Sequence, residues 1–584
     1  MSEDFVSSTK ADLTRKYVLG RDGWVFLDHD SNRVLDQCRG LYRLDAAGVQ
    51  KWVALLEARE AYCQQIGARH VMLVAPNKET VYAENLPAIM PLSEARAVRQ
   101  VEAALKSAAA APPLYPLAAL REGRQQGLVY PMTDTHWSGF GAAIAYRQLI
   151  KSLRAKGVRV KAVHPARVTF DTVEIVGDLG VKLSPPKASQ TLAARIEQPS
   201  GRLVFDNHIP NRGRMRVFVN EDNSRPSCVM FGDSFGGNLL PFLKESFSTL
   251  VYVYGKVFDR ELIEAYRPDV VITQIVERFM IEPPSDDPHF TYLSVLRDKL
   301  GLLSTDDLAD LDRQCGEVTP AVFAFGAAIK AIIADRDGQP LPERIVEEIK
   351  TRHGHNSEIA HLLATHYLRC GDPLSAVKFA EAAVRGQPNR PQFHHQHALV
   401  NLRLGNSAVA EPSLRSAIEL DPNVPWWHYQ LAQALFRQQN FAAARDQARD
   451  YLRWRPASAD AWQLIGRCEE ALGNWDGAIA ALWQASRAKP DWRWPLVKIS
   501  GLCLKQKSHV AEGLRAAEQL VQLPGTARQS AESWLLRAHL LVELSRLDEA
   551  LDCAERSCAA DPDWVWARSS KDAMKSKVPM QAAE

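Results

Sequence analysis

The sequence lacks the cysteine patterns that mark disulfide frameworks and zinc sites. It has nine cysteines in 584 residues, an odd number, and they are scattered without a Cys-x-x-Cys pair. Small disulfide-bonded domains and structural zinc sites need paired, closely spaced cysteines. The composition therefore predicts free thiols in a reducing compartment, and no metal or other cofactor is expected.

Long apolar runs and a strong net charge are also missing. No stretch approaches the roughly 18 apolar residues that a membrane-spanning helix needs. The formal net charge is only +2, which gives no basic field for nucleic acid. The first ten residues carry acids where a signal peptide carries bases, so a cytoplasmic location is expected.

What the sequence does have is a period of 34 residues in its C-terminal half. Five prolines keep this spacing: Pro388, Pro422, Pro456, Pro490 and Pro524. Small residues recur 24 positions before them, at Ala364, Ala398, Ala432, Gly466 and Ser500. Thirty-four is the period of the tetratricopeptide repeat (TPR), a pair of packed helices. About six repeats are predicted over 356–563, with a capping helix after them, and such arrays bind protein partners.

Aromatic residues gather in the same half, which holds eleven of the fourteen tryptophans. Packing in the helical core is the favoured interpretation. Pairs such as Trp426 and Trp427 cannot both point inward, so a groove that stacks on sugars or grips a peptide stays open as an alternative. His394, His395 and His397 have no acidic or cysteine neighbours, which makes a metal site there a minor alternative.

The N-terminal half alternates short apolar runs with helical patterns, which indicates an α/β fold with a parallel sheet flanked by helices. The expected strands are 70–75, 228–231, 250–254 and 270–276, and the expected helices are 46–66, 92–109, 138–155, 236–248 and 259–266. The stretch 160–226 is richer in turns and in short β-like runs, and an insertion is the interpretation offered for it. We expect a catalytic domain over 1–284, a helical connector over 285–355 and the repeats over 356–584.

A candidate nucleophile follows the second expected strand. Gly232-Asp233-Ser234-Phe235-Gly236 leads from that strand through a sharp turn into a helix. Ser234 then stands at a strand's carboxyl end, where open sheets bind ligands, beside backbone N–H groups that can stabilise an oxyanion. The alternative is a plain turn in which Ser234 caps the helix, and the motif alone does not exclude it.

A second motif supplies a candidate base. Asp134 and His136 are two positions apart in Thr133-Asp134-Thr135-His136-Trp137, so in an extended chain their side chains share one face. Histidine can accept the proton of a serine hydroxyl, and a carboxylate orients the ring. Ser138 is placed to cap the next helix. A structural Asp–His pair is the alternative for this motif alone.

Together these motifs resemble the alginate O-acetyltransferase family of SGNH-hydrolase-like proteins. Three further segments, Gly20–Leu27, Val74–Tyr82 and Val276–Phe279, support the resemblance, which covers about residues 18–284. It implies Ser234 as nucleophile, His136 as base and Asp134 as the acid that orients the base. It also implies the backbone N–H of Ser234 as one oxyanion donor. Substrate-binding or oxyanion roles are weaker predictions for Asn77, Asn238, Gly255 and Arg278. For Arg278, a buried ion pair with Glu277 or with another acid is an equal alternative.

The resemblance implies acetylation of exopolysaccharide hydroxyls, which family members usually perform in the periplasm. The favoured hypothesis is an O-acyltransferase acting on a bacterial surface glycan or its precursor, with the TPR array docking a protein partner. No sequence motif identifies the acyl donor. Acetyl-CoA and a membrane acyltransferase partner are the two alternatives. A carbohydrate esterase with the same three residues and a non-catalytic TPR scaffold are the alternatives.

Overall fold

A computed structural model describes residues 16–28, 32–87, 92–286, 291–319 and 322–576. The first 15 residues, on which the expectation of a cytoplasmic location rests, lie outside these ranges. The chain divides into two compact units, residues 1–353 and 354–584. The segment expected as a connector therefore belongs to the first unit, where it contributes α10 (Tyr292–Lys299), α11 (Thr305–Glu317), α12 (Gly326–Arg336) and α13 (Glu343–His353).

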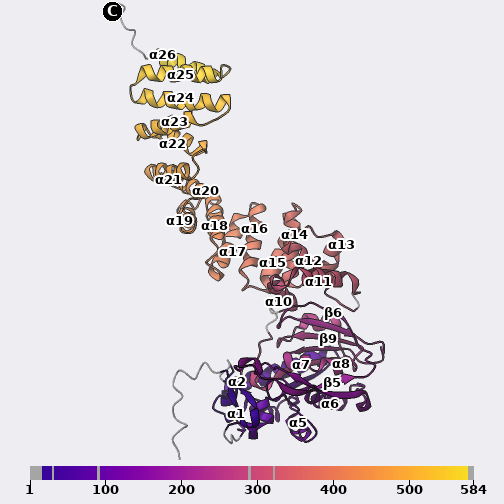
Figure 1. The fold of residues 1–584 in the computed structure, drawn as a ribbon. Helices are drawn as coiled ribbons and strands as arrows, with labels where there is room; N and C mark the ends of the chain where they lie inside the picture. The colour runs from indigo at the N-terminus through magenta and orange to yellow at the C-terminus, as the bar shows by residue number, and fades with distance from the viewer. Residues whose placement is uncertain (1–15, 29–31, 88–91, 287–290, 320–321, 577–584) are drawn as a thin grey trace, which may run out of the picture. The chain divides into compact units, whose positions relative to one another are not determined.

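The first unit is built on a six-stranded sheet in the order β3-β10-β8-β9-β7-β6 (Figure 1). Strands β3 (Arg69–Ala75), β10 (Val270–Val276), β8 (Cys228–Gly232) and β9 (Thr249–Tyr254) run parallel, as predicted. Strands β7 (Met215–Val219) and β6 (Arg202–Asp206) continue the sheet antiparallel. Part of the stretch read as an insertion thus belongs to the main sheet, which is mixed.

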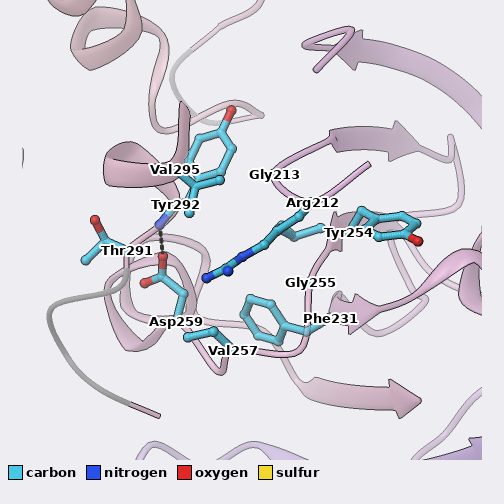
Figure 2. Close-up of a pocket in the computed structure, with 11 residues that line it drawn as sticks. Arg212, Gly213, Phe231, Tyr254, Gly255, Val257, Asp259, Thr291, Tyr292 and Val295 are labelled. Carbon is cyan, nitrogen blue, oxygen red and sulfur yellow. Dashed lines mark hydrogen bonds between the residues drawn. The ribbon is translucent and has the colours of Figure 1, made fainter. Parts of the chain in front are cut away.

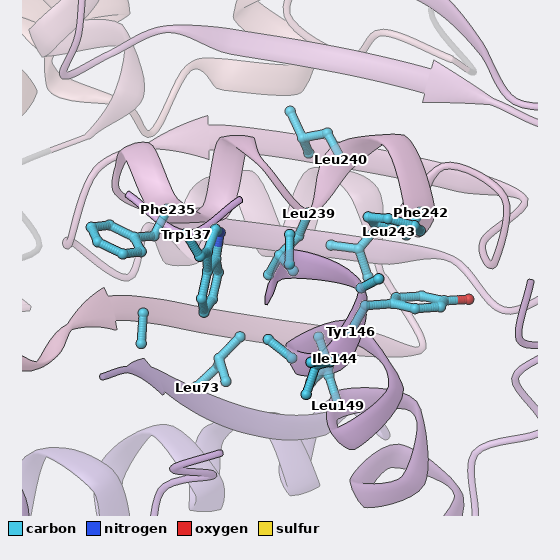
Figure 3. Close-up of a cluster of buried hydrophobic side chains, with 14 of the residues drawn as sticks. Leu73, Trp137, Ile144, Tyr146, Leu149, Phe235, Leu239, Leu240, Phe242 and Leu243 are labelled. Atoms are coloured by element: carbon cyan, nitrogen blue, oxygen red, sulfur yellow. The ribbon is translucent and has the colours of Figure 1, made fainter. Parts of the chain in front are cut away.

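Alternate residues of β3 face two different hydrophobic clusters, as a strand buried on both faces requires. Val71 and Leu73 pack with Trp137 and with residues of α6 (Gly139–Ala155). Met72 and Val74 pack with residues of α2 (Ala46–Gln65) and α4 (Ala97–Leu105). Figure 3 shows the first cluster, in which Trp137 lies beside Phe235.

The helices that follow the Ser234 motif are short. Strand β8 leads into α7 (Ser234–Gly237) and then α8 (Leu240–Leu243), where a single helix over 236–248 was expected. Helix α9 (Arg260–Tyr266) follows β9. Ser138 caps α6 as predicted, since its Oγ accepts the N–H of Gly141 at 3.0 Å.

The remaining elements of the first unit are small. Strands β1 (Tyr17–Leu19) and β2 (Val25–Leu27) form one hairpin, and β4 (Val168–Ile175) and β5 (Ser189–Ile196) form another. Helices α1 (Val34–Arg39), α3 (Lys78–Val81) and α5 (Leu117–Gly123) lie between the larger elements in sequence. In the described ranges, no helix combines the length and the apolar character that a membrane span requires.

The second unit contains six helix pairs and a final helix, which confirms the predicted repeats (Figure 1). The pairs are α14 (Ser357–Arg369) and α15 (Pro373–Gly386), α16 (Pro391–Arg403) and α17 (Ser407–Leu420), α18 (Pro425–Arg437) and α19 (Phe441–Leu452), α20 (Ala459–Ala471) and α21 (Trp475–Ala488), α22 (Arg493–Gln506) and α23 (Val510–Gln522), and α24 (Ala527–Glu543) and α25 (Leu547–Ala560). Helix α26 (Val565–Lys575) is the last helix of the described residues. Each proline of the 34-residue series follows a second helix, because proline cannot continue it.

The tryptophans of this unit divide between core and surface. Trp427 is buried, while Trp426, Trp454 and Trp566 are exposed. The three histidines of α16 have ordinary hydrogen-bond partners: His394 contacts the carbonyl of Pro388, His395 contacts Gln430, and His397 contacts Ser413. These contacts account for the three rings without a metal.

Candidate active site

Ser234 stands on a tight turn that neighbouring strands hold in place. The preceding residue, Asp233, accepts the N–H of Phe235 at 3.0 Å and the N–H of Val276 at 2.7 Å with its carboxylate. Its own N–H donates to Oε1 of Gln274 at 3.1 Å. Asp233 and Gln274 therefore fix the turn to β10. The sequence did not reveal this role of either residue, since the contacts join positions about forty residues apart.

The structure brings Ser234, His136 and Asp134 into one line of hydrogen bonds. The Ser234 hydroxyl donates to Nε2 of His136 at 2.6 Å, and Nδ1 of His136 donates to Oδ1 of Asp134 at 2.8 Å. The same Asp134 oxygen accepts the backbone N–H of His136 at 2.8 Å. This is the arrangement in which an imidazole can take the proton of a serine hydroxyl while a carboxylate fixes the ring.

Asp134 is held in its charged form by hydrogen bonds. Burial acts to raise the pKa of its carboxyl, but donation from the His136 ring, the His136 N–H and the Asp178 N–H outweighs burial and places the pKa below its ordinary value. The carboxylate is thus available to orient the imidazole at neutral pH.

A buried lysine supports the loop that carries Asp134. Nζ of Lys78 donates to the carbonyls of Asp134 at 2.7 Å and Met132 at 3.1 Å. Burial lowers the pKa of Lys78 to about 8. The sequence showed Lys78 only as part of the Val74–Tyr82 segment; its contact with the Asp134 loop spans 56 positions.

A second acid near His136 was missed. Asp178 lies between β4 and β5, and its carboxylate accepts the N–H of Thr135 at 2.7 Å. Its Oδ2 is 3.8 Å from Nδ1 of His136. A Gly-Asp-Leu-Gly stretch in a turn-rich region carries no signal that would have placed it there.

The three residues open onto a cavity of about 440 Å³. The β4–β5 hairpin supplies one wall through Ile175, Thr191, Leu192 and Ala193, and Asn238 lines it beside Ser234. The volume lies in the range of small-molecule pockets. A small-molecule ligand can thus be accommodated beside the serine.

Of the four residues with weaker substrate-binding predictions, Asn238 alone lines this cavity. Asn77 is buried, and its Oδ1 accepts the N–H of Arg278 at 3.2 Å. The Arg278 guanidinium lies 5.6 Å from the centre of the Phe235 ring. It is not the ion-pair partner of Glu277, because Arg96 takes that place at 2.8 Å.

Gly255 lines a different and smaller pocket, together with Phe231, Asp259 and Arg212 (Figure 2). Its N–H donates to the carbonyl of Gly232 at 2.9 Å, so it is not available to an oxyanion. The oxyanion role predicted for Gly255 is therefore wrong. The N–H of Ser234 stays a predicted donor.

A cation could in principle bind between three of these side chains, because their ligand atoms lie within 4.8 Å of one another. They belong to Asp134, His136 and Asp178. The hydrogen bonds among them already explain the arrangement. Nδ1 of His136 faces Asp134, and both Asp178 oxygens accept from Thr135. We therefore do not assign a metal to this group.

Comparisons with known proteins agree with this architecture. Residues 17–257 match the family described as "SGNH hydrolase-like domain, acetyltransferase AlgX", and residues 402–465 and 531–563 match tetratricopeptide repeats. A probable alginate O-acetylase AlgJ of Pseudomonas syringae pv. tomato is 31% identical over 144 residues, which cover 24% of this chain and 34% of that one. The AlgJ of Pseudomonas aeruginosa is 28% identical over 140 residues.

The chain spans about a third of the length of these curated relatives. Among solved structures, the O-acetyltransferase domain of Pseudomonas putida AlgJ is 20% identical, with a TM-score of 0.33, and the match covers 49% of this chain and all of that one. MamA of Desulfovibrio magneticus RS-1 is 19% identical, with a TM-score of 0.26, over 28% of this chain and 92% of that one. The chain thus joins an SGNH-hydrolase-like domain, similar to those of alginate O-acetyltransferases, to a C-terminal array of tetratricopeptide repeats.

Proposed function

We propose that the protein is a serine-dependent O-acyltransferase that acetylates hydroxyls of a bacterial surface polysaccharide or its precursor. The observation that carries the proposal is the hydrogen-bonded line from Ser234 through His136 to Asp134, which faces a cavity. The acetyl group and the polysaccharide acceptor are proposed by analogy with the relatives, which are named alginate O-acetylases.

The geometry supports a two-step reaction. His136 Nε2 takes the proton of Ser234, and Oγ attacks the acyl carbonyl carbon. The proton then passes to the leaving group, which departs with the electrons of its bond and leaves an acyl-serine. A sugar hydroxyl next gives its proton to His136 and attacks the acyl carbon, and Ser234 recovers its proton as it leaves.

The repeat array is proposed to dock a protein partner, since TPR units present extended binding surfaces. An acyl donor delivered by such a partner is consistent with the absence of a recognisable donor motif in the sequence.

The test is the intact mass of the full chain after incubation with p-nitrophenyl acetate. We expect an acetyl-sized adduct on Ser234 and none on a Ser234→Ala variant. Release of the acyl group is then timed with and without an oligosaccharide. Faster release with acceptor, and an acetylated sugar as product, support transfer; release to water alone makes the protein an esterase. If the Ser234→Ala variant carries the same adduct, the acyl-serine is refuted.

A further inference from the structure

His136 faces a second carboxylate besides Asp134. Oδ2 of Asp178 lies 3.8 Å from Nδ1 of the ring, and Oδ1 of Asp134 lies 2.8 Å from the same atom. The Asp178 side chain is 39% exposed, so its charge is partly screened but not lost to solvent. A serine–histidine–acid line needs one carboxylate, so the second calls for an explanation.

Asp178 is fixed in this place by reciprocal hydrogen bonds. Its two oxygens accept the N–H and the hydroxyl of Thr135, at 2.7 and 2.5 Å. Its own N–H donates to Oδ2 of Asp134 at 3.1 Å. The preceding Gly177 lies so close that a Cβ there would be 2.3 Å from the carbonyl oxygen of Thr133. The turn between β4 and β5 is therefore hydrogen-bonded and closely packed against the loop 133–136, so the two segments are expected to move together.

The charges around His136 indicate what the second carboxylate does. The Lys78 ammonium donates to the Asp134 carbonyl, and the Arg278 guanidinium lies over Phe235, whose ring centre is 4.9 Å from that of His136. Without Asp178, Asp134 would be the one carboxylate against the ring, while Lys78 and Arg278 each contact a residue that touches His136. Both cations oppose the positive charge that the ring gains when it takes a proton.

We infer that Asp178 is a positioning residue that stabilises the protonated imidazole of His136 during acylation of Ser234. The inference rests on the proposed function, which requires His136 to hold that proton. At this distance and exposure, a carboxylate moves the titration of its partner by about half a pH unit to one unit.

The test is the pH–rate profile for acetylation of Ser234 by p-nitrophenyl acetate, measured on the full chain in the presence of EDTA. Asp178→Asn removes the charge but keeps an amide that can accept from and donate to Thr135. We expect its acidic limb to move to lower pH by about half a unit to one unit, and its plateau to fall about three- to tenfold. Thr135→Val is the matched control, because it loses the hydroxyl contact and keeps the charge, and its limb should not move.

An unmoved limb in Asp178→Asn, or an equal movement in Thr135→Val, would overturn the inference. A second measurement separates this result from failure of the proposed function. Histidine-selective NMR titration of the same variants, assigned by loss of one signal in His136→Gln, reports the imidazole whether or not an acyl-serine forms. If no variant forms an adduct, the proposed function fails, while a lower titration midpoint in Asp178→Asn still supports the charge coupling.

Discussion

The hydroxyl of Ser234 lies 2.6 Å from Nε2 of His136, although the two residues are 98 positions apart in the chain. The contact joins two loops. One follows β8 and carries Ser234, and the other precedes α6 and carries His136.

Replacing Asp134 by Asn should disable the base without unfolding the domain. The amide keeps the size of the carboxylate but has no negative charge. It therefore no longer holds the His136 ring in the tautomer that carries a proton on Nδ1. We expect acylation of Ser234 to fall roughly a thousandfold or more. The measurement is the rate of adduct formation with p-nitrophenyl acetate.

Asp171→Asn is the control for that loss, since Asp171 is an exposed residue of β4. Its acylation rate should match that of the unmodified chain. An Asp134→Asn variant that keeps more than a tenth of the rate would contradict the role of the carboxylate.

Adding one methyl group at Gly177 should separate the β4–β5 segment from the catalytic loop. A Cβ there would lie 2.3 Å from the Thr133 carbonyl oxygen and 2.6 Å from Cβ of Asp134. Because backbone atoms cannot move aside easily, Gly177→Ala should slow acylation at least tenfold and destabilise the unit by about 1–3 kcal/mol. Adduct kinetics and thermal unfolding report the two effects.

Gly255→Ala provides the comparison, because no atom lies within 4 Å of a Cβ at that position. It should change neither rate nor stability appreciably. A strong loss of activity in Gly255→Ala would indicate that Gly255 contacts the substrate, which its position in a separate pocket argues against.

The sequence predicted the parts of the site that are local or follow a known spacing. Asp134 and His136 lie two positions apart, and Ser234 follows directly on an apolar strand, so each motif is legible by itself. The 34-residue period similarly predicted the helix pairs, because each repeat packs only on its neighbours.

What the sequence could not predict depends on distant contacts. Asp178 reaches His136 through a turn-rich segment without periodicity, and Lys78 reaches the Asp134 carbonyl from a buried short helix. The pairing of Glu277 with Arg96 rather than Arg278 is a choice between two nearby cations, which only packing decides. The short β-like runs of 160–226 were visible in the sequence, but the place of β6 and β7 in the main sheet was not, since such runs do not reveal which strands they pair with.

The buried charge of Lys78 should make the first unit more stable as the solution becomes alkaline. Its folded pKa of about 8 is below the ordinary value of 10.5, so the unfolded chain binds more protons between these values and unfolding becomes less favourable as pH rises. Between pH 8 and 9.5 the gain is about 2 kcal/mol. Urea unfolding of the unmodified chain and of Lys78→Met at both pH values measures it as a difference, which cancels the titration of other groups.

The Lys78→Met variant should lack this gain, because methionine keeps an apolar stem of similar length without the charge. If the free energies of unfolding of the two proteins change in parallel between pH 8 and 9.5, Lys78 does not titrate in this window. Its ammonium would then be stabilised by the loop carbonyls more strongly than its burial suggests.

Trp426 and Trp427 offer a test of the repeat array within one dipeptide. Trp427 is 6% exposed and packs in a core that runs from α16 to α21, with its ring 5.4 Å from that of His395. Trp426 is 50% exposed. Truncating a buried tryptophan costs about 3–5 kcal/mol, so Trp427→Ala should lower the unfolding midpoint of the second unit by about 6–20 °C. Trp426→Ala should lower it by less than about 2 °C. Calorimetry of the full chain measures both midpoints. Equal effects would mean that Trp426 makes packing contacts that its exposure does not show.

If Trp426→Ala leaves stability unchanged, the variant can be used to test whether Trp426 contacts a partner or a glycan, because a loss of binding could then not be ascribed to unfolding.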